Sequence, residues 1–522
     1  MDSIGLMGRG QNKKQLLKPY GRMRSRTLVH VTFSGVLLRL LTGLLLMYRH
    51  SILRAYVIGY LSSTTPRVIS SLRQVWRNDL NYQQKRRVLF RALTSAIRLE
   101  SFPTFCASLV GGSTIFPLLI FQLAEFLSQR VGFKGNRSDS VKFLRLCRLA
   151  CAFLSAWLSF ELLNRKPIRL QGDERMFADN ESNEVADRQQ GFQDKRHSRS
   201  QLAGRTMDLT LFSFTRAVDL VASIIWARWR RWRSARGRWS RAESLAPKLA
   251  DSGVFAASAA VVMWAWFYLP ERLPKSYGKW IGEVAKVDSR LIEALRRVRR
   301  GVFVYGKNTG QAPLLQSMCE DYGWPMEWGD PSKTIPIPCE MVHMGCGPNC
   351  EKHAVSRFAR TFGFACATYI PLQIAFRLRR LKSVLSLRRA VSDALRSSAF
   401  LASFVTIFYY SVCLARTRIG PKVFPRDVIT PMMWDSGLCV GAGCLMCGWS
   451  ILVESPSKRQ ELALFVAPRA AATVLPRFYD KQYQYRERIT FAVSAALLLT
   501  CLQERPDLVR GVFGRIATSV LK

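Results

Sequence analysis

The sequence is short of acidic residues and of histidine. Of its 522 residues, 36 are Asp or Glu against 78 Lys or Arg, so the formal net charge is +42, and five are His. A P-loop, a GxSxG elbow, an HExxH motif and a recognisable pair of carboxylates are all missing, which argues against the enzymes built on those motifs. Helix-turn-helix, zinc-finger and RNA-recognition signatures are missing too, so we expect no nucleic-acid partner despite the positive charge.

Targeting signals and a disulfide framework are also missing. The first apolar block begins only near Val31, after a basic stretch, so no cleavable secretory signal is expected. The 13 cysteines are odd in number, which does not fit a secreted disulfide scaffold. We expect most of them to act as small buried apolar residues. Many stand inside apolar blocks, among them Cys106, Cys151, Cys366, Cys413 and Cys501.

Long apolar blocks separated by basic stretches make up much of the chain, of which 48% is hydrophobic. A membrane-spanning helix needs about 20 mostly apolar residues. The clearest blocks are 101–127, 251–269, 397–415 and 429–453, and weaker ones are 31–47, 146–163, 209–227, 362–376, 460–475 and 489–502. The chain is therefore predicted to be an all-α, polytopic helical membrane protein with roughly six to ten membrane segments. Its basic stretches would face a lipid bilayer with anionic headgroups.

Four regions are predicted from the distribution of charge. Residues 165–206 carry mixed charge and few apolar residues, which predicts a disordered linker. The linker separates an N-terminal membrane region, 1–164, from a larger membrane region, 207–505, and a tail follows at 506–522. The larger region contains a Cys/His-rich loop, 319–353, which we expect at the surface.

A tryptophan- and arginine-rich stretch follows the apolar block 209–227. On a helical wheel its four tryptophans gather on one side, apart from most of the arginines. One interpretation is an interfacial helix on an anionic membrane surface. The favoured one is an aromatic anchor that only fixes the preceding span. The four residues are Trp226, Trp229, Trp232 and Trp239.

Ionisable residues within apolar blocks are candidates for a polar path through a membrane protein. Arg216 and Asp219 are three positions apart on the predicted helix and could pair. Asp435 stands alone in block 429–453. The competing interpretation places all three at the ends of spans, where their charges reach the headgroups.

The only dense group of soft ligands lies between Cys339 and His353, where 15 residues hold three cysteines and two histidines. Cys339 with His343, and Cys350 with His353, form two short-spaced pairs joined by a Gly- and Pro-containing turn. Four thiolate and imidazole ligands suit tetrahedral zinc, and Cys346 is an alternative ligand. Two other interpretations remain open, a packed loop with hydrogen-bonded histidines and a thiol–disulfide site.

Four segments resemble the transmembrane protein 135 family, whose N-terminal module is rich in cysteine. They are Leu273–Ile281, Pro336–His343, Arg396–Ser403 and Ser457–Arg469. The most specific parts of the resemblance are the Pro-Cys-Glu-x-Val-His and Arg-Gln-Glu-Leu-Ala-Leu motifs within these segments. The family is distantly similar to the inner-membrane translocases and the small peroxisomal membrane proteins. Its Cys/His motif falls on Cys339, His343, Cys350 and His353, and Cys346 looks like an addition.

The resemblance implies a non-enzymatic integral protein of the peroxisomal membrane, or alternatively of the mitochondrial membrane, that acts in lipid homeostasis or organelle dynamics. Homo-oligomers or other membrane proteins are possible partners. Two alternatives stay open: a translocase- or channel-like component that uses the polar residues, and a metal-dependent membrane enzyme that uses the Cys/His loop.

Overall fold

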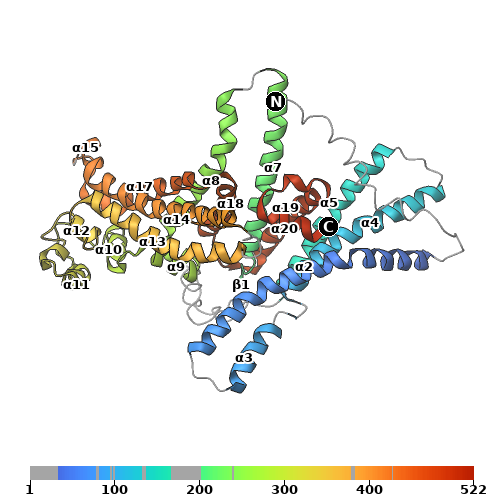
Figure 1. The fold of residues 1–522 in the computed structure, drawn as a ribbon, viewed down its shortest axis with the longest axis horizontal. Coiled ribbons are helices and arrows are strands. Elements are labelled where there is room, and N and C mark those ends of the chain that lie inside the picture. The colour runs from blue at the N-terminus through green and yellow to red at the C-terminus, as the bar shows by residue number, and fades with distance from the viewer. Residues whose placement is uncertain are drawn as a thin grey trace, which may run out of the picture. The chain divides into compact units, whose positions relative to one another are not determined.

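The computed structural model describes residues 33–77, 82–94, 97, 100–131, 137–165, 202–237, 240–377, 383–425 and 427–521. These residues are almost entirely helical (Figure 1). Most of the predicted linker, from 166 to 201, lies outside them. Two compact units arise from the packing. Of the described residues, the first unit holds those up to 165, 202–228 and 480–521, and the second holds those from 229 to 479. The four regions drawn from the sequence remain a prediction.

Six helical segments of the described residues are long and apolar enough to cross a membrane. The chain is therefore an all-α polytopic membrane protein, and six of the predicted blocks are confirmed. Blocks 362–376, 460–475 and 489–502 are not among the six, because charged residues stand close to their short apolar runs. Block 31–47 begins outside the described residues. The six segments are Phe102–Ala124, Val141–Leu163, Met207–Ala235, Leu249–Tyr268, Val384–Val423 and Pro431–Val453.

The first unit is a set of long helices around an aromatic core. Helix α4 packs between α2 and α5, and α5 also packs against α19. Phe105, Phe160 and Phe491 bring one ring from each of α4, α5 and α19 into the core. Outside this core, Leu154 and Leu158 of α5 are exposed, as expected of a helix that faces lipid. The helices are α2 (Phe33–Arg77), α3 (Tyr82–Thr94), α4 (Phe102–Val131), α5 (Arg137–Leu163), α7 (Met207–Ala235, which continues into the second unit), α19 (Gln484–Glu504) and α20 (Gly511–Leu521).

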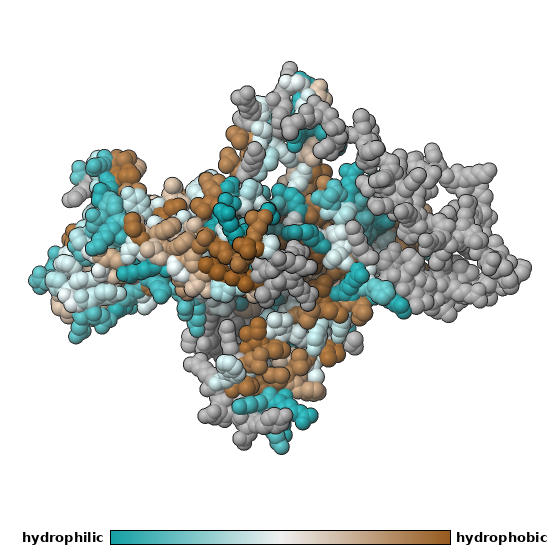
Figure 2. Space-filling model, viewed as in Figure 1, coloured by the Kyte–Doolittle hydropathy of each residue, from teal (hydrophilic) through white to brown (hydrophobic). Residues whose placement is uncertain are grey.

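The second unit joins long apolar helices to a small helical module. Helices α13 and α14 form an antiparallel hairpin, α14 also packs against α17, and α8 packs against α17 and α18. In Figure 2 the part around α11 and α12 is mostly hydrophilic, and hydrophobic residues gather over α13, α14 and α18. The helices are α8 (Arg241–Tyr268), α9 (Lys275–Ala285), α10 (Ser289–Arg299), α11 (Ala312–Tyr322), α12 (Cys339–Val342), α13 (Cys350–Arg377), α14 (Val384–Cys413), α15 (Gly420–Val423), α16 (Pro431–Met433), α17 (Cys439–Cys447) and α18 (Pro456–Val474).

Short 3-10 and π segments and two minimal strands connect these helices. The strands, β1 (Leu202–Ala203) and β2 (Tyr479–Asp480), have two residues each. The 3-10 segments are η2 (Pro270–Arg272), η3 (Met326–Gly329), η7 (Gly448–Val453), η8 (Lys481–Tyr483) and η9 (Pro506–Leu508). The π segments are η5 (Leu414–Arg418) and η6 (Trp434–Leu438).

Glycine permits the closest approach between the backbones of α8 and η7. A Cβ atom on Gly448 would lie 2.5 Å from the Cα atom of Ala256. Gly448→Ala is therefore expected to lower the stability of the purified protein by about 1–3 kcal/mol, because a packed backbone has little room to move away. Thermal unfolding in detergent measures the effect.

Gly253 gives the matched control. It lies in α8 itself, and a Cβ atom there meets nothing within 4 Å. Gly253→Ala should be neutral or raise stability by about 0.5–1 kcal/mol, because alanine favours a helix. Equal melting shifts for the two variants would contradict the close approach.

Candidate metal centre

The segment that carries the Cys/His motif is a short helix, a tight reversal and a helix start. Helix α12 begins at Cys339, and His343 follows its last residue. The chain then reverses through Met344, Gly345 and Gly347, whose φ values of 51°, 81° and 83° lie in the left-handed region. Glycine occupies this region at little cost, so the two glycines make the reversal possible.

Asn349 then starts helix α13. Its side-chain Oδ1 accepts hydrogen bonds from the backbone N–H groups of Glu351 and Lys352, at 2.9 and 3.0 Å. Such bonds satisfy donors that have no partner in the first helical turn. Cys350 is thereby fixed in the first turn of α13.

Three potential metal ligands meet where this segment contacts the end of α14. The side-chain ligand atoms of His343, Cys350 and Cys413 all lie within 4.8 Å of one another. The three residues are 0%, 6% and 4% exposed. Two come from the Cys/His segment, and the third is the last residue of α14. This buried group could bind a metal.

The orientation of the His343 ring fits such a role. Its Nδ1 lies 2.7 Å from the carbonyl oxygen of Gly347, to which it can only donate. The neutral ring then carries its lone pair on Nε2, which lies 3.4 Å from the Cys413 Sγ. In a tetrahedral zinc site a nitrogen and a sulfur ligand are about 3.5 Å apart. A second hydrogen bond that fixes the tautomer is typical of metal-binding histidines.

The structure brings together two of the four predicted ligands, His343 and Cys350, and adds Cys413. Cys339 is half-buried nearby, where burial raises the pKa of its thiol and the neighbouring Cys350 raises it further, against the opposing effect of Arg416. The alternative ligand Cys346 lies apart from the three, with its Sγ 3.8 Å from the Ser356 hydroxyl.

Cys413 is buried, as expected of a cysteine in an apolar block, and it also ends α14 against a histidine. One expectation about this group was wrong. The loop does not hold its ligands at the surface, because His343 and Cys350 pack beneath the reversal and are buried.

The fourth predicted ligand, His353, lies beside the three rather than among them. Its ring stacks on His343 with the centroids 4.5 Å apart, and Tyr409 meets it edge-on at 5.3 Å. Neither of its ring nitrogens has a hydrogen-bond partner among the described residues. Burial, and then the neighbouring His343, lower the pKa of His353 to about 3, so the ring is neutral at physiological pH.

Arg357 ties the start of α13 to the end of α9. Its Nη1 donates to the carbonyl oxygens of Ala285 and Lys286, at 3.3 and 3.2 Å. Tyr409 of α14 donates to the same Ala285 oxygen, at 3.0 Å, and its ring lies 4.7 Å from the Arg357 guanidinium carbon. A cation stabilises the C-terminal end of a helix. These contacts hold α9, α13 and α14 together beside the three ligands.

Asp435 is part of a buried ion pair, not a lone charge in an apolar block. Arg416 donates to both of its carboxylate oxygens, and the two residues are 6% and 1% exposed. Arg416 also donates to the Ile337 carbonyl oxygen, at 2.7 Å, and Tyr305 donates to Asp435. Burial, and then the charge of Asp435, raise the pKa of Tyr305 well above its usual value, so its hydroxyl remains a donor.

Arg216 and Asp219 have other partners in the first unit. Asp219 is paired with Arg510, whose Nε lies 3.3 Å from the Oδ2 of Asp219. The guanidinium of Arg216 packs against the rings of Phe212 and Phe513, 5.4 and 5.7 Å from their centroids. Both polar residues therefore have stabilising contacts within their own unit.

The tryptophan-rich stretch continues a membrane-length helix. Trp226, Trp229 and Trp232 lie in the last turns of α7, and Trp239 lies outside the described residues. The guanidinium of Arg236 covers the Trp232 ring, 4.0 Å from its centroid. Trp232 is half-exposed near the end of the span, and both interpretations of the tryptophans, the interfacial helix and the anchor, stay predictions.

No family model, no curated protein and no solved structure matches the chain.

Proposed function

We propose that this integral membrane protein belongs to the peroxisomal or mitochondrial membrane and acts there in lipid homeostasis or membrane dynamics, as the resemblance to the transmembrane protein 135 family implies. The observation that carries the proposal is an apolar cavity of about 380 Å³ in the second unit, lined mainly by α8, α9, α14 and α18. Sites for small molecules in proteins have volumes of roughly 300–1,000 Å³. Two of the lining helices, α8 and α14, are long and apolar enough to cross a membrane.

The cavity suits a hydrocarbon guest because most of its lining side chains are apolar and two of its polar groups donate to backbone carbonyls. Trp266 donates its indole N–H to the carbonyl oxygen of Gly278, at 3.2 Å. Tyr409 donates its hydroxyl to Ala285. A cavity lined by apolar side chains excludes water and accepts apolar molecules. This supports lipid handling over the conduction of water or ions.

The translocase- or channel-like alternative depends on a polar path along Arg216, Asp219 and Asp435. Asp219 and Asp435 each pair with an arginine inside their own unit, and Arg216 packs against two aromatic rings. A charge that is already compensated is a poor lining for a conducting path. These contacts favour the lipid proposal.

We propose further that the metal held by His343, Cys350 and Cys413 is zinc, with Cys339 as the fourth ligand and a structural role. A catalytic zinc site keeps a position open for water or substrate, whereas a structural one is closed by protein ligands. Burial of all three residues argues for the closed kind, and hence against a metal-dependent enzyme.

Membrane extraction and imaging test the proposal. Alkaline carbonate should leave the untagged protein in the membrane pellet, because six apolar helices cannot leave lipid as soluble segments. A fluorescent fusion should coincide with peroxisomal or mitochondrial markers, and deletion of the gene should change the lipid composition of that organelle.

Three results would count against it. Release of the protein by carbonate would contradict the membrane assignment, and a signal in another membrane would contradict the organelle. An unchanged lipid composition would contradict the role in lipid homeostasis.

A further inference from the structure

We infer that the apolar cavity of the second unit binds one acyl chain of a lipid with an anionic headgroup, and that Arg469 holds the headgroup. This inference rests on the proposed function, and adds to it the chemical class of the ligand. The candidate ligands, a fatty acid and a phosphate-bearing lipid, share a hydrocarbon chain that ends in an anionic group, a carboxylate or a phosphate.

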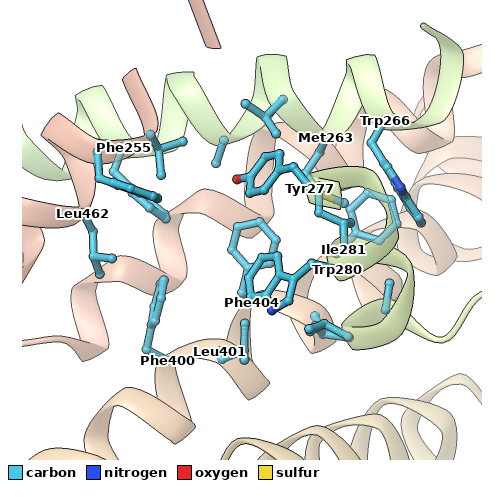
Figure 3. Close-up of a pocket in the computed structure, with 18 of the residues that line it drawn as sticks. Phe255, Met263, Trp266, Tyr277, Trp280, Ile281, Phe400, Leu401, Phe404 and Leu462 are labelled. Carbon is cyan, nitrogen blue, oxygen red and sulfur yellow. The ribbon is translucent and has the colours of Figure 1, made fainter. Parts of the chain in front are cut away.

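The shape of the cavity suits a chain. The residues labelled in Figure 3 run from Phe255 and Leu462 at one end to Trp266 at the other. Side chains from α8 and α14 face each other across the space, and α9 contributes Tyr277 and Trp280. An elongated apolar space buries a chain of methylene groups, each of which gains about 0.8 kcal/mol on leaving water.

A cation lies at the edge of this apolar lining. The guanidinium carbon of Arg469 is 5.4 Å from the ring centroids of both Tyr277 and Phe465, and these two residues line the cavity. Within the described part of the chain, no carboxylate pairs with Arg469. Its guanidinium is therefore available to bind an anion. It can donate two parallel hydrogen bonds to a carboxylate or a phosphate.

The sequence places this cation at the end of a motif. Arg469 closes the segment Ser457–Arg469, which resembles the transmembrane protein 135 family. The same helix, α18, contributes Leu462, Phe465 and Val466 to the cavity. One helix face thus supplies both the apolar wall and the charge, as recognition of an amphipathic lipid requires.

The test uses the full-length protein in its own membrane and three photoreactive palmitoyl probes. The probes are the free acid, lysophosphatidic acid and the uncharged monoglyceride, each with a diazirine in the acyl chain. After illumination, mass spectrometry measures the label on the peptides of α8 and α14. The two anionic probes separate a carboxylate source from a phosphate source, and the monoglyceride reports the chain alone.

Arg469→Gln should weaken labelling by the preferred anionic probe by about 10- to 100-fold and leave the monoglyceride unchanged, because only the charge-assisted hydrogen bonds are lost. Arg477→Gln is the matched control, because Arg477 is exposed and lies over the ring of Phe478, which does not line the cavity. It should label like the wild type.

Ala259→Phe fills the cavity and should abolish labelling by all three probes, provided that the variant melts within a few degrees of the wild type. Undiminished labelling of that variant, or equal labelling of Arg469→Gln and the wild type by both anionic probes, would overturn the inference. Either result would leave the membrane assignment and the organelle intact. Localisation to another membrane would contradict the proposed function and leave lipid binding in place.

Discussion

Cys413→Ser should reduce the zinc content of the purified protein from about one ion per chain to near none, because a serine hydroxyl does not replace a thiolate on zinc. The thiol of Cys413 is one of three buried ligands, and its Sγ lies 3.4 Å from the Nε2 of His343. Elemental analysis of protein that elutes as a single species in gel filtration measures the effect.

Cys447→Ser is the control for this experiment. Cys447 is as deeply buried as Cys413, but its Sγ lies 3.4 Å from the Cys444 carbonyl oxygen, and it is not in a ligand group with a histidine among the described residues. This variant should keep its zinc. Wild-type protein without zinc, or a Cys413→Ser variant that retains it, would contradict the assignment of the metal.

Asp435→Ala should destabilise the protein by about 3–5 kcal/mol, the cost of leaving a buried charge without its partner. Arg416, which is 6% exposed in the wild type, would then have no carboxylate on its Nε. Tyr305 would also lose the acceptor of its hydroxyl. Urea or thermal unfolding in detergent measures the difference in free energy.

A second ion pair and a double replacement make this result specific. Arg377 and Asp393 form a pair that is 36% and 39% exposed. Asp393→Ala should therefore cost less than about 1 kcal/mol. Replacing both buried charges, with Arg416→Met and Asp435→Leu together, should recover much of the stability lost in the single variant. Similar losses for Asp435→Ala and Asp393→Ala would show that the buried pair is no stronger than a surface one.

The membrane helices could be predicted because hydropathy is a property of neighbouring residues. Each of the six segments is an apolar run that a window of residues reveals without knowledge of the fold. The partners of the buried charges could not be predicted in this way. Asp219 pairs with Arg510, and Asp435 with Arg416, at separations that no helical period suggests.

The group of metal ligands could also be predicted only in part from the sequence. The spacing of His343 and Cys350 marked both as ligands, but Cys413 stood in an apolar run and resembled other buried thiols. The one available signal was its place near the end of the apolar block 397–415, just before Arg416. Nothing in the sequence predicts the cavity, because an unfilled space depends on how side chains from several helices pack together.

The distance along the chain between these ligands has a consequence for biosynthesis. Cys413 follows His343 by 70 residues, so a ribosome that adds ~5–20 residues per second needs about 4–14 s to supply it. During that interval the metal group lacks its third ligand. All three ligands come together only after the hairpin of α13 and α14 has closed. Binding of the metal ion would therefore follow the synthesis and membrane insertion of α14.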